Sequence, residues 1–181
     1  MEHPDHLRLI RDGVPDTDGK SDDPDPVWAD LGSGGGAFTL ALVDALGGRG
    51  TIYSVERDRG ALGRQAQTMR AWFPDANVVY TQGDFTRPLD LPPLDGIVMA
   101  NALHFVRDQQ PLVARLRDCL RPGGRFILVE YDTDRGNHWV PYPLAYPSWE
   151  ALAHTAGFAT TRLLATYPSR FLGRIYAALS I

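Results

Sequence analysis

The sequence has very little cysteine and lysine. A single cysteine, Cys119, excludes an intrachain disulfide framework, a multi-cysteine zinc site and a three-cysteine iron–sulfur site for radical chemistry. Lys20 is the only lysine and the arginines are scattered, so clustered cations for a nucleic acid partner are missing. No apolar run approaches the roughly 20 residues of a membrane-spanning helix, and the start lacks the basic-then-apolar order of a signal peptide. We therefore expect a cytoplasmic protein with neither nucleic acid nor membrane as a partner.

Acidic charge is concentrated at the start of the chain. Residues 1–25 hold eight acids and three bases, whereas the formal net charge of the whole chain is -4. Residues 16–26, rich in Asp, Pro and Gly, are typical of a flexible joint that follows a short helix around residues 6–11. We interpret residues 1–25 as an arm that is either a lid over the site or a disordered tail, and residues 26–181 as one domain.

From residue 26 onward, short apolar runs alternate with stripes at helical spacing. The expected strands are residues 27–29, 52–55, 78–80, 96–100, 126–129, 160–166 and 175–179. The stripes are Leu62/Ala66/Met69/Phe73 and Leu112/Leu116/Cys119/Leu120, and a further helix is expected near 148–156 with Ser148 as its N-cap. This alternation predicts an α/β fold, a doubly wound three-layer sandwich with a mostly parallel sheet. Too few residues separate the last two strands for a helical crossover, so the last strand should run antiparallel.

A glycine-rich loop, Asp30 to Thr39, leaves the first expected strand and opens a helix. Gly32 allows a sharp turn, Gly34 allows the backbone to approach a ligand, and the small Ala37 allows close packing of helix and strand. Glu56 follows at the end of the second strand, where a carboxylate can accept hydrogen bonds from both hydroxyls of a ribose. The alternative is that Glu56 is a solvated residue or pairs with Arg57.

Asp30, Gly32, Gly34 and Gly36 resemble the Asp-x-Gly-x-Gly-x-Gly signature of class I S-adenosylmethionine-dependent methyltransferases. Glu56 is similar to the ribose-binding acid of that family. The resemblance implies a Rossmann-like, seven-stranded sheet with a reversed final strand. It also implies that Asp30 meets the ammonium group of the methyl donor, directly or through water; alternatively, Asp30 only caps the loop.

Two further segments resemble elements of the same family. In Gly83-Asp84-Phe85, the resemblance implies that Asp84 accepts from the adenine amino group and that Phe85 lies against the base; an ordinary turn residue and a core aromatic are the alternatives. Leu120-Arg121-Pro122-Gly123-Gly124 resembles the family's turn before the fifth strand, and we expect its proline and glycines to stop a helix.

Asn101-Ala102-Leu103-His104-Phe105 comes just after the fourth strand, at the edge where open α/β sheets bind ligands. It resembles the Asn-x-Leu-His element of the small-molecule branch related to ubiquinone and menaquinone biosynthesis methyltransferases. His104 is a candidate general base, and packing against the donor or a helix start is the alternative. The aromatic, proline-containing loop over residues 132–147 either forms an apolar acceptor pocket or closes the core.

These observations predict an S-adenosylmethionine-dependent methyltransferase that acts on a small-molecule acceptor, with a homodimer as a further expectation. The alternatives are a non-catalytic module that binds S-adenosylmethionine or S-adenosylhomocysteine and an NAD-binding oxidoreductase. The acid at the glycine loop opposes a pyrophosphate and disfavours the oxidoreductase. No metal is expected. The predicted cofactor-binding residues are Asp30, Gly32, Ser33, Gly34, Gly36, Glu56, Arg57, Asp84, Phe85 and Asn101, and the predicted catalytic residue is His104.

Overall fold

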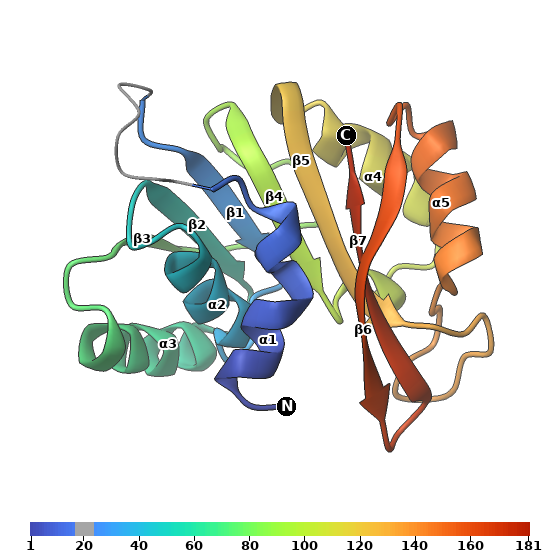
Figure 1. The fold of residues 1–181 in the computed structure, drawn as a ribbon, viewed down its shortest axis with the longest axis horizontal. Helices are drawn as coiled ribbons and strands as arrows, with labels where there is room; N and C mark the ends of the chain where they lie inside the picture. The colour runs from blue at the N-terminus through green and yellow to red at the C-terminus, as the bar shows by residue number, and fades with distance from the viewer. Residues whose placement is uncertain (17–23) are drawn as a thin grey trace.

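A seven-stranded sheet in the order β3-β2-β1-β4-β5-β7-β6 forms the middle of the molecule (Figure 1). The computed structural model describes residues 1–16 and 24–181, so most of the expected joint lies outside the described residues. Strands β1 to β5 run parallel to their neighbours among themselves, whereas β7 runs antiparallel to both β5 and β6. The strands are β1 (Val27–Leu31), β2 (Thr51–Glu56), β3 (Asn77–Gln82), β4 (Leu94–Ala100), β5 (Leu120–Tyr131), β6 (Thr161–Ser169) and β7 (Gly173–Ser180). The predicted sheet with an antiparallel last strand is confirmed.

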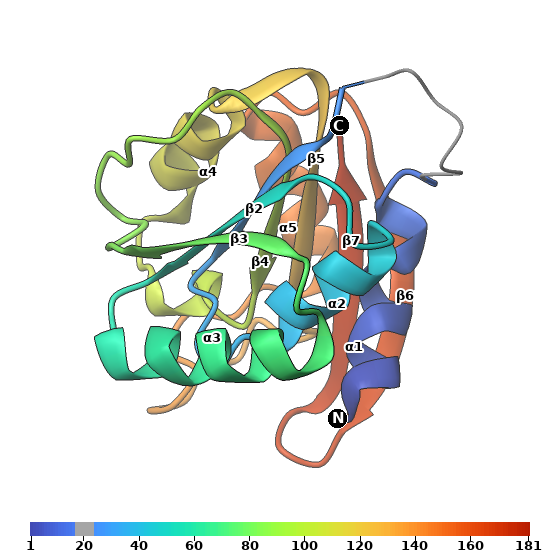
Figure 2. The same ribbon diagram turned by 90° about the vertical axis from the view of Figure 1, so that its left-hand side faces the viewer.

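Helices cover both faces of this sheet (Figure 2). One face carries α1 (His3–Ile10), α2 (Ala37–Ala45) and α3 (Arg59–Trp72); the other carries α4 (Gln109–Arg117) and α5 (Tyr146–Thr155). The two cores alternate along each strand, so Trp28 faces α1 and α2 while Ala29 faces α4 and α5. The doubly wound, three-layer sandwich is therefore confirmed. Within the described residues, no helix is long and apolar enough to cross a membrane.

Three local predictions were wrong. Ser148 lies inside α5, whose N-cap is Ala145, because a proline in the first turn starts this helix earlier. Helix α4 ends at Arg117, so Cys119 lies beyond it, and Leu120 is recruited into β5 by pairing with Leu94.

Pro122-Gly123-Gly124 does not stop a helix but lies within β5, at a register shift. Leu120 pairs with Leu94 and Arg125 with Gly96, so the four residues between Leu120 and Arg125 face a single residue of β4. Gly123 has φ +75°, a value that glycine adopts without strain, and the bulge re-registers β5 before its buried part.

Candidate functional site

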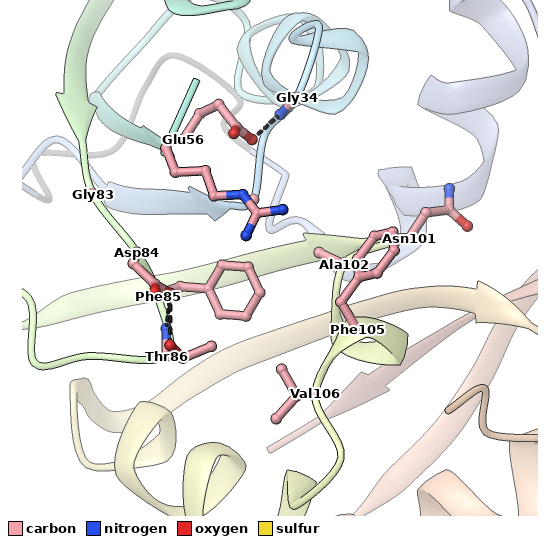
Figure 3. Close-up of a pocket in the computed structure, with 12 residues that line it drawn as sticks. Gly34, Glu56, Gly83, Asp84, Phe85, Thr86, Asn101, Ala102, Phe105 and Val106 are labelled. Carbon is pink, nitrogen blue, oxygen red and sulfur yellow. Dashed lines mark hydrogen bonds between the residues drawn. The ribbon is translucent and has the colours of Figure 1, made fainter. Parts of the chain in front are cut away.

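A cavity of about 370 Å³ opens at the carboxyl edge of the sheet, beside the loops that follow β1, β2, β3 and β4 (Figure 3). The strand order reverses between β1 and β4, and open α/β sheets bind ligands at such a switch point. The residues that line the cavity are Gly32, Gly34, Glu56, Arg57, Gly83, Asp84, Phe85, Thr86, Asn101, Ala102, Phe105 and Val106.

The glycine loop brings the backbone close to this cavity. Gly32 has φ +74°, and a Cβ atom there would lie 2.8 Å from the Ala102 side chain and 3.0 Å from the Phe85 ring, so a side chain is excluded. Gly34 has φ +52° and open space where its Cβ would be. A side chain at Gly34 would project into that space, so glycine keeps the loop surface accessible to a ligand.

Glu56, at the end of β2, is tied to the glycine loop. Its Oε2 accepts a hydrogen bond from the Gly34 amide at 3.0 Å (Figure 3). Its Oε1 accepts from the Asp58 amide at 2.9 Å. Each carboxylate oxygen can accept about two hydrogen bonds, so each retains the capacity for one more. The carboxylate is thus fixed by the backbone and still able to bind two further donors.

Asp84 and Phe85 form the wall that follows β3. Asp84 Oδ1 accepts from the Thr86 amide at 2.9 Å and from the Thr86 hydroxyl at 2.6 Å. These bonds stabilise the ionised carboxyl, chiefly the one from the hydroxyl, and lower the pKa of Asp84. Figure 3 shows the Phe85 ring turned into the cavity below Glu56. Arg115 donates to the Phe85 carbonyl at 3.0 Å and so anchors this wall to α4.

Asp30 does not line the cavity. It is only 1% exposed, and its Oδ2 accepts from the Thr39 hydroxyl at 2.6 Å in the first turn of α2. Burial disfavours the charged form and raises the pKa of Asp30 to about 7, although the bond from the Thr39 hydroxyl acts in the opposite direction. The negative charge of Glu56 raises this pKa further, and a bond from the Thr39 amide lowers it.

Ser33 and Gly36 also lie outside the cavity lining. The Ser33 hydroxyl faces the Gln65 amide and the Ser54 hydroxyl, each at 2.8 Å, beneath the loop. Gly36 is the N-cap of α2 with φ +85°, and a Cβ there would lie 2.5 Å from the Gln65 side chain. Both residues shape the loop from behind.

Asn101 lines the cavity with an unusual backbone. Its φ of +49° places a non-glycine residue in the left-handed region, which asparagine tolerates better than most residues. Its amide donates to the Val129 carbonyl at 2.8 Å. Within the described part of the chain its buried Oδ1 has no hydrogen-bond partner, and Figure 3 shows the amide group turned away from Glu56 and Phe85. Such strain and an unsatisfied oxygen are typical of functional positions.

His104 does not line the cavity but lies directly behind Phe105, with ring centroids 4.3 Å apart. It is 3% exposed, and its Nδ1 lies 2.8 Å from Oε2 and 3.0 Å from Oε1 of Glu130, which is 1% exposed. The His104 amide also donates to Glu130 Oε1 at 3.2 Å. Because carboxylate oxygens accept hydrogen bonds, Nδ1 is the ring nitrogen that donates in this pair.

The structure thus brings seven of the predicted residues together around one cavity: Gly32, Gly34, Glu56, Arg57, Asp84, Phe85 and Asn101. It places Asp30, Ser33, Gly36 and His104 behind its walls.

Sequence reasoning missed four positions of this region. Thr86 and Val106 line the cavity, and Gln65 and Glu130 are the buried partners of loop and histidine. Two of these positions could have been found from the sequence, because a polar residue within an apolar pattern indicates a buried polar group. Gln65 interrupts the apolar stripe of α3, and Glu130 ends the apolar run of β5.

The leading helix α1 lies away from the cavity. Leu9 and Ile10 are fully buried in the core with Trp28 and Leu42, and none of the residues 1–16 lines the cavity. In this structure α1 covers the sheet, and its apolar side chains pack against α2 and β6.

Comparison with known proteins identifies a family whose matched region includes the glycine loop, and solved structures with the same fold. A family model described as "Methyltransferase domain" matches residues 29–126. Carboxy-S-adenosyl-L-methionine synthase of Shewanella sp. (strain W3-18-1) is 30% identical over 104 residues, which cover 56% of this chain and 42% of that protein. The chain therefore spans less than half the length of this curated relative.

Solved structures share the fold at low sequence identity. Burkholderia thailandensis 1,6-didemethyltoxoflavin-N1-methyltransferase, solved with bound 1,6-didemethyltoxoflavin and S-adenosylhomocysteine, has a TM-score of 0.69 at 19% identity, over 98% of this chain and 76% of that one. The CurJ carbon methyltransferase has a TM-score of 0.72 at 16% identity, over 88% of this chain and 49% of that one.

Proposed function

The chain belongs to the methyltransferase domain family, and on this premise we propose that it transfers a methyl group from S-adenosylmethionine to a small-molecule acceptor. The observation that carries the proposal is the placement of two carboxylates, Glu56 and Asp84, around one cavity beside the glycine loop. S-adenosylmethionine supplies a methyl group on a positively charged sulfur, together with a ribose, an adenine and an amino acid end.

Glu56 fits a ribose. Its two oxygens each hold one backbone amide, from Gly34 and from Asp58, and each can accept one more hydrogen bond. A vicinal diol offers one hydroxyl to each oxygen. Charge-assisted bonds of this kind contribute about 1.5–3 kcal/mol each, which makes Glu56 the strongest single anchor in the proposal.

Asp84 and Phe85 fit a purine. The two bonds from Thr86 both reach Asp84 Oδ1, so Oδ2 can accept from an exocyclic amino group. The Phe85 ring offers an apolar face beside it. We propose that these two residues hold the adenine, with Arg57 lining the same cavity after β2.

Acidic groups disfavour a dinucleotide at this site. A pyrophosphate needs free amides at the loop and at the helix N-terminus. Here the Gly34 amide already donates to Glu56, and the Asp30 carboxyl lies at the first turn of α2, where it accepts from the Thr39 hydroxyl. A phosphate group would therefore meet carboxylates where it requires donors, whereas a cationic sulfur is attracted by them.

We propose that His104 accepts a proton from acceptors that must lose one. Glu130 holds the imidazole through Nδ1, so Nε2 is the nitrogen that would take this proton. The main contribution of the remaining residues is alignment of the acceptor at about 3–3.5 Å from the methyl carbon with water excluded, which can lower the barrier by about 7–11 kcal/mol.

The acceptor side is rich in aromatic surface. Phe105 is 59% exposed and lines the cavity, and Tyr142 is held beside it because its amide donates to the His104 carbonyl at 3.0 Å. Trp139 is strongly exposed on the same loop. These side chains support a small, apolar or aromatic acceptor. Assembly into a homodimer and a cytoplasmic location stay predictions.

Two titrations and one assay test the proposal. We expect S-adenosylmethionine and S-adenosylhomocysteine to bind in isothermal titration calorimetry, and NAD not to bind. Turnover of labelled S-adenosylmethionine against a library of phenols, enols and amines then separates an enzyme from a non-catalytic binding module. Binding of NAD in place of both adenosyl compounds would refute the proposal; binding without turnover of any acceptor would favour the non-catalytic module.

A further inference from the structure

A buried glutamine beneath the glycine loop, which the sequence analysis did not single out, donates two hydrogen bonds to that loop. Gln65 reaches from α3 and is 2% exposed. Its Nε2 donates to the Gly34 carbonyl at 2.7 Å and to the Ser33 hydroxyl at 2.8 Å, and its Oε1 accepts from the Ser54 hydroxyl at 2.8 Å. Gln65 therefore links the loop to both α3 and β2.

The Gly34 residue is consequently held on both sides. Its amide donates to Glu56 and its carbonyl accepts from Gln65, so the cavity-lining residue is fixed between two side chains. Gly36 packs so closely on Gln65 that no Cβ fits there. Since Gly34 has φ +52° and few contacts on its open side, little else restrains its orientation.

We propose that Gln65 is the positioning residue of the donor site, which sets donor affinity by holding Gly34 in the orientation that engages Glu56. The inference rests on the proposed function and concerns a residue that does not touch the cavity. An apolar side chain at this position leaves the partly buried Gly34 carbonyl and the buried Ser33 hydroxyl with fewer partners, so the loop relaxes to find others. Glu56 then loses the Gly34 amide that orients it.

The chemistry of the amide offers a readout that simple packing does not. Gln65→Met removes both donors at similar volume. Gln65→Glu retains an oxygen for Ser54, but the introduced carboxyl donates to the Gly34 carbonyl only when it is protonated. Asp30, through Thr39, and Glu56 are the acids that face this region, and both favour the protonated form of the introduced carboxyl.

The test is S-adenosylhomocysteine titration of both variants and the unaltered chain at pH 6 and pH 8. We expect Gln65→Met to bind about tenfold more weakly at both pH values. At pH 8 we expect Gln65→Glu to bind S-adenosylhomocysteine as weakly as Gln65→Met does. At pH 6 we expect Gln65→Glu to regain most of the lost affinity. Each affinity is expressed as a ratio to that of the unaltered chain at the same pH. The matched control is Gln109→Met, because Gln109 is a second buried glutamine whose Nε2 donates to the Tyr142 carbonyl at 2.7 Å, away from the glycine loop.

Several results would overturn the inference. Gln65→Met binding within twofold of the unaltered chain would refute it, and so would an equal loss in Gln109→Met, which would indicate general destabilisation. If Gln65→Met does not fold, a Gln65→Glu variant without pH-dependent recovery refutes it instead. Failure of the unaltered chain to bind S-adenosylhomocysteine would refute the proposed function itself, which distinguishes the two failures.

Discussion

The donor half and the acceptor half of the candidate site are constructed differently. The donor half follows β1, β2 and β3 and consists of backbone turns, with Gly34 held between Glu56 and Gln65. The acceptor half follows β4 and β5, and there one side chain holds another, because the Glu130 carboxylate binds the His104 ring through Nδ1. We therefore expect changes in the donor half to act on the binding of S-adenosylmethionine, and changes in the acceptor half to act on the acceptor.

The comparison predicts that variants in the acceptor half change turnover and not donor affinity. His104→Gln should lower kcat by about a hundredfold or more for an acceptor that loses a proton, because the general base is removed. Its affinity for S-adenosylhomocysteine should stay within twofold. Rates with labelled S-adenosylmethionine, together with calorimetry, check both parts.

Glu130→Gln is the matched variant for that experiment, since it retains the shape of the residue but not the carboxylate that orients the ring. We expect a smaller loss of about tenfold in kcat. Unchanged turnover in both variants would leave His104 with a packing role only.

In the donor half, the expected effect is on affinity. Glu56→Ala should weaken S-adenosylhomocysteine binding by one to two decades, roughly 1.4–2.8 kcal/mol, because the ribose loses a charged acceptor and Gly34 loses its partner. The control is Glu150→Ala on α5, an exposed acid remote from the cavity. Equal affinities in calorimetry for Glu56→Ala and the control would show that this cavity does not hold the ribose.

Asp30 should make the stability of the donor half depend on pH. The pKa of Asp30 in the folded chain is about 7, above the ordinary value of 3.8. Its contribution to stability is therefore fully present below pH 3.8 and is lost as the pH rises through 7. Between pH 6 and 8 the unaltered chain should lose about 1 kcal/mol relative to Asp30→Asn. Urea unfolding at both pH values measures this difference, and a constant difference would mean that Asp30 is ionised in both states.

The smallest effect on catalysis is expected for Gln109, which joins α4 to the loop that carries Tyr142. Gln109→Met removes the bond to the Tyr142 carbonyl and should raise KM for the acceptor about threefold, without a change in donor affinity. Steady-state kinetics with varied acceptor and fixed, saturating S-adenosylmethionine measure it. A rise in the KM for the donor, measured with varied S-adenosylmethionine and saturating acceptor, would contradict the separation of the two halves.

Much of the fold could be predicted because its signals are local. The apolar runs of the strands and the stripe of α3 follow the periods of strand and helix, and every expected strand was found. The bulge at Pro122-Gly123-Gly124 could not be predicted, because it depends on the register between β4 and β5 and not on the local sequence.

The part of the candidate site that could be predicted is the part formed by turns, because the spacing of glycines and acids along the sequence indicates where such turns occur. Gly32, Gly34, Glu56 and Asp84 do line one cavity, although their binding roles stay predictions. The burial of Asp30 under α2 depends on Thr39 and on helix packing, which spacing does not reveal. Glu130 is paired with His104 only through the adjacency of β4 and β5 in the sheet.

The most direct test of the central claim is a two-dimensional NMR titration of the ¹⁵N-labelled chain with S-adenosylhomocysteine. The account predicts that the amides of Gly34, Asp58, Thr86 and Asn101 shift most, because they lie at the two carboxylates and at the cavity wall. Shifts concentrated elsewhere, for example at the surface hollow around His154 and Thr160, would contradict it.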